Sequence, residues 1–166
     1  MSDTSLDEAV TNLAADLTRR GARLAVAESL TSGAVGTALG RGPDTQEWFA
    51  GSVVAYQMAT KTHVLGVDAD IDPCSAECAI QLATGVRRLV DTDYAVAVTG
   101  VGGPDADDAG HPAGTVYIAA VSDDASTWRL HEFDGDPAAV IAQSVEAAVA
   151  LLREVVNPVS GARRDA

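Results

Sequence analysis

The sequence predicts a three-layer α/β/α sandwich around a mixed, mostly parallel sheet of about five strands. Three observations lead to this fold class. Short apolar runs of strand length are continuous rather than alternating, which is typical of strands covered on both faces. Segments with helical periodicity lie between these runs along the chain. Apolar residues make up 47% of the chain and aromatic residues only 4%, so the core must be built from Ala, Val, Leu and Ile.

The first half of the chain alternates between helical and strand-like segments. Leu6 begins a run in which leucine and valine recur at helical spacing, and Gly21 ends this helix. RLAVA and WFAGSVVAY are apolar runs that predict buried strands, and the small residues of SGAVGTALG predict a helix between them. In chain order we expect a helix at 5–20, a strand at 23–27, a helix at 32–40, a strand at 48–56 and one or two helical turns at 58–67.

The second half continues the same pattern. Pro73 is tolerated in the first turn of a long helix, which Asp72 or Ser75 would cap. TWRLHEF alternates between apolar and polar residues, as an edge strand does. These elements form one domain over 1–156, and we expect 157–166 to be a disordered tail. In chain order we expect a helix at 72–90, strands at 94–98 and 114–121, an edge strand at 127–133 and a helix at 136–156.

The charge and the cysteines exclude several classes of function. Acidic residues outnumber Lys and Arg by 24 to 11, and such a surface repels phosphate backbones, so we expect no nucleic-acid partner. No apolar stretch reaches the roughly 18 residues of a transmembrane helix, and the first residues lack the features of a signal peptide. We therefore expect a cytoplasmic protein without a membrane partner.

Cys74 and Cys78 are expected to be reduced and packed in the core. The pair lacks further ligands for a metal ion, so we expect no metal and no cofactor.

Three polar or glycine-rich segments follow buried strands, where open α/β sheets bind their ligands. The helix that starts within AESLTSG offers backbone N–H groups that can receive an anion or an oxyanion. The glycines of TGVGGP let the backbone approach a ligand closely. The candidate residues are Glu28, Ser29, Thr31, Ser32 and Gly33 after the first strand, Tyr56 and Lys61 after the second, and Thr99, Gly100, Gly102 and Gly103 after the third.

Lys61 is the only lysine in a chain with ten arginines. Unlike arginine, a lysine can be tuned to lose its proton and act as a base. A lysine whose pKa is lowered by burial can take the proton of a serine, so Ser29 and Lys61 predict an acyl-transfer site. The residues alone also leave open a solvated surface lysine, a Ser29 or Thr31 that only caps the helix, and a tight glycine turn at 99–104.

The segments AESLTSG, VAYQMATK, LGV, SAECA, AVAVTGVGGP and PAGTVYIA occur in the order and spacing of the CinA-like C-terminal domain family. The chain resembles this family over roughly residues 5–155. The family is similar to nicotinamide-nucleotide amidases, which hydrolyse the carboxamide of nicotinamide mononucleotide to the acid and ammonia. The resemblance implies a three-layer α/β/α sandwich, a homodimer and a small-molecule substrate. It also implies that Ser29, Tyr56 and Lys61 are catalytic and that Thr99 belongs to the site.

The sequence departs from the family pattern where a nucleotide phosphate would bind. Met58 replaces an asparagine, and Pro137 and Ile141 stand where arginines are common in the family. Asp105 and two further aspartates add negative charge beside the glycine loop. The nucleophile and base are kept while the cations are lost. Three functions therefore remain open: an amidase acting on nicotinamide mononucleotide, a Ser/Lys hydrolase of a less anionic amide, and a non-catalytic ligand-binding or regulatory module.

Overall fold

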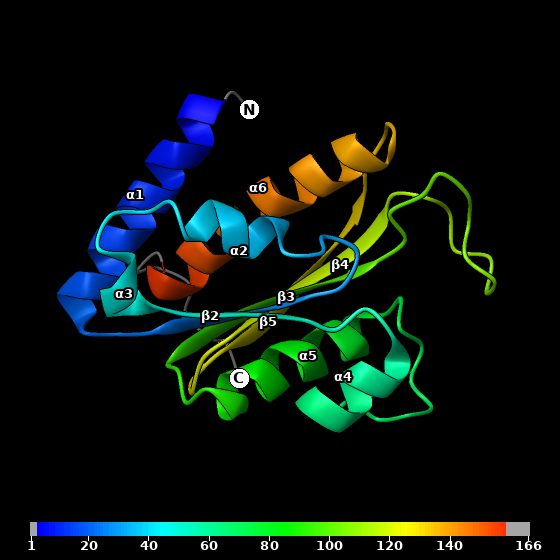
Figure 1. Cartoon of the computed structure of the whole chain (residues 1–166), viewed down its shortest axis with the longest axis horizontal. Helices are drawn as coiled ribbons and strands as arrows, with labels where there is room; N and C mark the ends of the chain where they lie inside the picture. Colours follow the sequence, from blue (N-terminus) through cyan, green and yellow to red (C-terminus); the bar gives the residue numbers. More distant parts are fainter. Residues whose placement is uncertain (1–2, 159–166) are drawn as a thin grey trace, which may run out of the picture.

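The structure is a computed structural model that describes residues 3–158, and it confirms the predicted sandwich (Figure 1). Five strands form one sheet in the order β2-β1-β3-β4-β5. They are β1 (Leu24–Glu28), β2 (Phe49–Val54), β3 (Tyr94–Gly100), β4 (Thr115–Val121) and β5 (Ser126–Glu132). β1 pairs in parallel with β2 and β3, whereas β4 is antiparallel to both β3 and β5. Of these five strands, only β4 is antiparallel to the others.

The connections explain why β4 is reversed. A parallel pair needs a crossover, usually a helix, to return the chain to the same end of the sheet. Such helices connect the strands before β3, but only the loop 101–114 joins β3 to β4. A short turn at 122–125 then joins β4 to β5. The long loop therefore lies at the end of the sheet where the carboxyl ends of β1, β2 and β3 meet (Figure 1).

The helices cover both faces of the sheet (Figure 1). Side chains alternate along each strand, so one face of the sheet carries large apolar residues such as Leu24 and Val26, and the other carries Ala25 and Ala27. The alanine face packs against the apolar side of α5, which closely spaced small side chains allow. One layer holds α1 (Asp3–Arg20), α2 (Ala34–Leu39), α3 (Thr45–Trp48) and α6 (Pro137–Val156); the other holds α4 (Met58–Leu65) and α5 (Ala76–Leu89).

At α5 and α6 the structure confirms a predicted cap, whereas the first turn of α5 and the short helix α3 differ from the prediction. Ser75 caps α5 by accepting from the backbone N–H of Cys78 at 3.1 Å, so Pro73 precedes the helix and does not occupy its first turn. Asp136 caps α6, as the sequence indicates, with Pro137 as the first helical residue. The short helix α3 was not predicted, because its four residues are too few to show a periodic pattern.

Beyond α6, Asn157 contacts α1. Its side chain accepts a hydrogen bond from Arg20 at 3.0 Å and donates one to Asp16. The first residue of the expected tail is therefore bound to the domain. Residues 159–166 of that tail lie outside the described residues. Within the described part of the chain, no helix has both the length and the apolar character needed to cross a membrane.

Candidate active site

A cavity of about 280 Å³ lies where the carboxyl ends of β1, β2 and β3 meet. Ser29 reaches it directly after β1, and Tyr56 and Lys61 reach it after β2. The end of β3 and the loop that follows it supply further lining residues. Three segments that are far apart in the sequence therefore meet in one pocket, because parallel strands bring their carboxyl ends to the same edge of the sheet.

Lys61 and Ser29 are in contact inside this pocket. Lys61 Nζ lies 3.0 Å from Ser29 Oγ. It also donates to the carbonyl oxygens of Ala55 and Tyr56, at 2.6 and 2.9 Å. Lys61 is only 1% exposed, and this burial lowers the pKa of its amine from the ordinary value of 10.5. The solvated surface lysine that the sequence left open is therefore excluded.

The contacts of Lys61 fit either charge state of its amine, because a charged ammonium would donate its three hydrogens to Ser29 Oγ and to the two carbonyl oxygens. A neutral amine has two hydrogens and one lone pair, and a carbonyl oxygen can only accept. If the two hydrogens go to Ala55 and Tyr56, the lone pair is left for the hydroxyl of Ser29. The lysine comes from α4 and its side chain extends back toward the start of that helix, as long helical side chains do. The same two carbonyls therefore hold the amine in place beside the serine.

Glu28, the residue before Ser29, lies on the opposite face of β1 and does not line the pocket. Its buried carboxylate accepts five hydrogen bonds. Their donors are the hydroxyls of Thr31 and Ser52 and the backbone N–H groups of Gly33, Val35 and Gly36. Glu28 therefore holds the start of α2 in place, because a carboxylate stabilises the N-terminus of a helix. Side-chain alternation along the strand separates Glu28 from the serine next to it.

This arrangement corrects the expectation for the start of α2. The N–H groups there were expected to be free for an anionic ligand, but those of Gly33, Val35 and Gly36 are bonded to Glu28. Neither serine nor threonine caps α2; the cap residue is Gly33, which has no side chain to do so. Thr31, Ser32 and Gly33 instead line a second groove, between α2 and α6, together with Ile141. Of the predicted site residues, Glu28 thus lines neither cavity, three line this groove, and the others line the Ser29 pocket.

The end of β3 and the start of the loop after it line the Ser29 pocket. Gly100, Gly102 and Gly103 are at its surface, and at Gly100 a Cβ atom would lie 2.2 Å from the carbonyl oxygen of Thr115. Thr99 also lines the pocket, but its hydroxyl donates to the carbonyl oxygen of Pro73 at 2.7 Å. Within residues 3–158, the backbone N–H groups of Gly102 and Gly103 have no hydrogen-bond acceptor. They are therefore available to a ligand.

One aromatic residue and two acidic residues also line the pocket. The side chain of Tyr56 is largely in solvent, since the residue is 65% exposed. Asp105 and Asp107 add two carboxylates to the lining. Asp107 accepts a hydrogen bond from the His111 ring, with 2.8 Å between the two atoms. This bond lowers the pKa of the aspartate and raises the pKa of the histidine.

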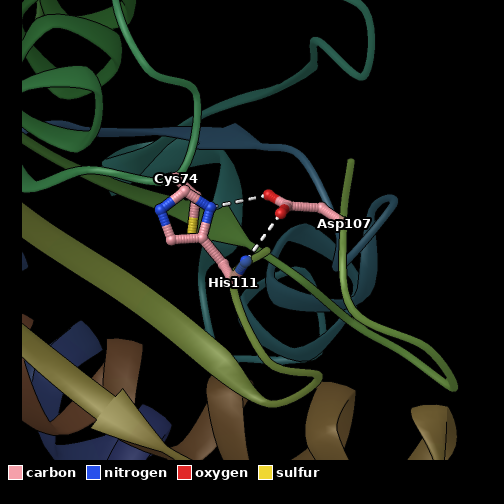
Figure 2. Close-up of side chains that lie close together, drawn as sticks. All are labelled: Cys74, Asp107 and His111. Carbon is pink, nitrogen blue, oxygen red and sulfur yellow. Dashed lines mark hydrogen bonds and ion pairs between the residues drawn. The ribbon is translucent and has the colours of Figure 1, made fainter. Parts of the chain in front are cut away.

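Cys74 also lines the pocket, although it was not among the residues predicted for the site. It lies beside the His111 ring, with Asp107 on the other side (Figure 2). Burial, followed by the charges of Asp107 and Asp72, raises the pKa of its thiol to about 11. The spacing of Asp107 and His111 within the long loop was the one sequence signal that could have indicated this cluster.

Known proteins resemble this chain in both sequence and fold. The family model of the CinA C-terminal domain matches residues 6–156. The chain belongs to this family. A CinA superfamily protein from Escherichia coli has a similar structure, with a TM-score of 0.88, 30% identity and coverage of 93% of both chains. A second, from Klebsiella pneumoniae, has a TM-score of 0.86 and 35% identity, and covers 91% of this chain and 97% of its own.

Curated relatives of this CinA-family chain carry two kinds of name. A Pseudomonas putida protein named nicotinamide-nucleotide amidohydrolase PncC is 35% identical over 143 residues, covering 84% of this chain and 89% of that protein. A putative competence-damage inducible protein from Desulforamulus reducens is 36% identical over 141 residues, covering 82% of this chain but 34% of that protein. The chain thus spans about a third of the length of several longer relatives.

Proposed function

We propose that this chain is an amidohydrolase in which Ser29 is the nucleophile and Lys61 is the general base. The observation that carries the proposal is the 3.0 Å contact between Lys61 Nζ and Ser29 Oγ, with the other contacts of the amine made to carbonyl oxygens. A buried lysine with a lowered pKa beside a serine is one of the known ways to activate a hydroxyl. The PncC name of one relative supports a carboxamide as the bond that is cleaved.

The proposed reaction has two steps. Lys61 takes the proton of Ser29 as the serine oxygen bonds to the carboxamide carbon, and the carbonyl electrons move to oxygen. The tetrahedral intermediate then collapses and the C–N bond breaks, while Lys61 gives the proton to the leaving nitrogen, which departs as ammonia. Water attacks the acyl-serine with Lys61 again as base, releasing the acid and restoring Ser29. The free N–H groups of Gly102 and Gly103 line the same pocket and are the proposed donors to the oxyanion.

The proposed substrate is nicotinamide mononucleotide, bound weakly. Pro137 and Ile141 supply no cation for its phosphate, and Ile141 lines the groove between α2 and α6 and not the Ser29 pocket. The acidic wall made by Asp105 and Asp107 repels an anion. That wall favours a second candidate, a Ser/Lys hydrolase of a less anionic carboxamide. The homodimer and the cytoplasmic location expected from the sequence stay predictions.

Ammonia release from nicotinamide mononucleotide and from its dephosphorylated riboside tests the substrate. We expect turnover of the nucleotide with a high KM, because a lost charge-assisted pair removes roughly 1.5–3 kcal/mol of binding. Ser29→Ala provides the blank, and its melting temperature shows whether the fold is kept. Equal rates or a preference for the riboside would reject the nucleotide in favour of the less anionic amide. If no carboxamide in a panel is hydrolysed, the chain is a ligand-binding module and the amidohydrolase proposal fails.

The pH dependence of kcat/KM tests the role of Lys61. Only the neutral amine can accept the serine proton, so the rate rises with pH as Lys61 loses its proton in the free enzyme. Because burial lowers the pKa of Lys61, the midpoint of this rise is expected below 10.5. The measurement is a rate profile from neutral to alkaline pH, with the fold followed by circular dichroism at each point. A rate that falls across this range would be incompatible with a lysine base.

A further inference from the structure

Three side chains of metal-ligating type meet at the wall of the pocket, outside the Ser29–Lys61 contact. They are Cys74, from the segment before α5, and Asp107 and His111, from the loop between β3 and β4 (Figure 2). One ligand atom from each lies within 4.8 Å of the other two. The fold therefore brings a sulfur, a nitrogen and a carboxylate oxygen together from two segments that are distant in the sequence.

His111 is held between two carboxylates. Its Nδ1 atom lies 2.8 Å from Asp107 Oδ2, and its Nε2 atom lies 3.3 Å from Asp72 Oδ2. The other oxygen of Asp72 accepts from the backbone N–H of Cys74 at 2.8 Å. The Asp72 carboxylate therefore lies beside Nε2, where an outer carboxylate can orient a metal-binding histidine. Nδ1 is then directed at Asp107, and a proton or a metal ion can join these two atoms.

We propose that Cys74, Asp107 and His111 form a binding site for a divalent transition-metal ion, and that the ion is zinc. Zinc accepts thiolate, imidazole and carboxylate ligands together, whereas magnesium and calcium take oxygen ligands. The ion replaces the proton between His111 Nδ1 and Asp107, and Cys74 releases its thiol proton to solvent. Zinc bonds of about 2.0–2.3 Å require the three groups to move closer together. The present spread of up to 4.8 Å is small enough for this contraction.

The site has an open position beside the proposed chemistry. Three protein ligands leave a fourth position in tetrahedral zinc, which is the pattern of sites that bind water or substrate. Cys74 and Asp107 both line the pocket that contains Ser29 and Lys61. A water molecule or a substrate atom in that pocket is therefore the proposed fourth ligand. The ion would also tie the long loop to the segment before α5.

Titration with Co²⁺, a spectroscopic substitute for zinc, tests the site on the full chain under reducing conditions. We expect one ion per chain and a near-ultraviolet charge-transfer band from a thiolate–cobalt bond, which zinc abolishes by displacing the cobalt. Cys74→Ser is expected to lose the band. Cys78→Ser is the matched control, because Cys78 is the other cysteine, is also buried, and lies outside the cluster. It should keep the band.

A second variant tests the orienting carboxylate. Asp72→Asn leaves the three ligands in place and is expected to weaken Co²⁺ binding by about 10–100-fold while keeping the band at saturation. Melting temperatures of all variants show whether each is folded. Absence of a thiolate band in the folded wild type, or a band that survives in Cys74→Ser, overturns the proposal. Because the readout is absorbance and not turnover, the result is independent of the amidohydrolase proposal.

Discussion

Replacing Lys61 with arginine is expected to reduce carboxamide hydrolysis by on the order of 10²–10⁴-fold, although the positive charge is kept. Arginine stays protonated in proteins and cannot accept the proton of Ser29. The amine of Lys61 is also enclosed by Ser29 and two backbone carbonyls, with 1% of the residue exposed, so a larger planar group does not fit. The measurement is kcat for ammonia release at saturating substrate.

A second substitution separates loss of the base from loss of the fold. Lys61→Met keeps an unbranched side chain and removes the amine, so it is expected to be equally inactive, and its melting temperature shows whether the fold is kept. If the arginine variant retained near-full turnover, the lysine would supply only charge and the proposed base would be wrong. Inactivity of both variants with a native circular dichroism spectrum supports the proposed role.

Glu28→Gln is expected to lower the free energy of unfolding by about 2–3 kcal/mol, the largest effect on stability that we predict for a nearly isosteric change. The buried carboxylate accepts five hydrogen bonds, shared between its two oxygens. In glutamine an amide NH2 group replaces one of these oxygens, so it would point at hydrogen-bond donors and not at acceptors. A buried N–H group left without an acceptor costs about 1–3 kcal/mol, and the remaining bonds lose their charge. For a chain of this length the melting temperature should fall by roughly 4–12 °C.

Urea unfolding measures this effect, with Glu132→Gln as the matched control. Glu132 is exposed on the edge strand β5, so the same chemical change there is expected to stay within about 0.5 kcal/mol. Equal stability of the Glu28 variant and the control would mean that the carboxylate does not hold the start of α2. In that case Glu28 would return to consideration as a substrate-binding residue.

The sequence by itself determined the order and type of nearly all the helices and strands. It also determined which end of the sheet would carry the candidate site. Continuous apolar runs mark β1 and β3, because strands covered on both faces have no polar side to show. The placement of Ser29 and Lys61 after successive parallel strands was enough to predict their meeting, since such strands end at one edge of a sheet. The caps at Ser75 and Asp136 could be predicted because capping depends on neighbours within one helical turn.

The tertiary structure alone decided which side chains face each cavity. Glu28 and Ser29 are adjacent in the chain, but the layer that covers each face of β1 directs one to α2 and the other to Lys61. That choice depends on how the sheet packs, which no local pattern encodes. The N–H groups at the start of α2 looked free because their acceptor, Glu28, precedes the helix and reaches it only in the folded chain. Cys74 and His111 meet for the same reason: a contact between distant segments exists only after β3 and α5 have packed together.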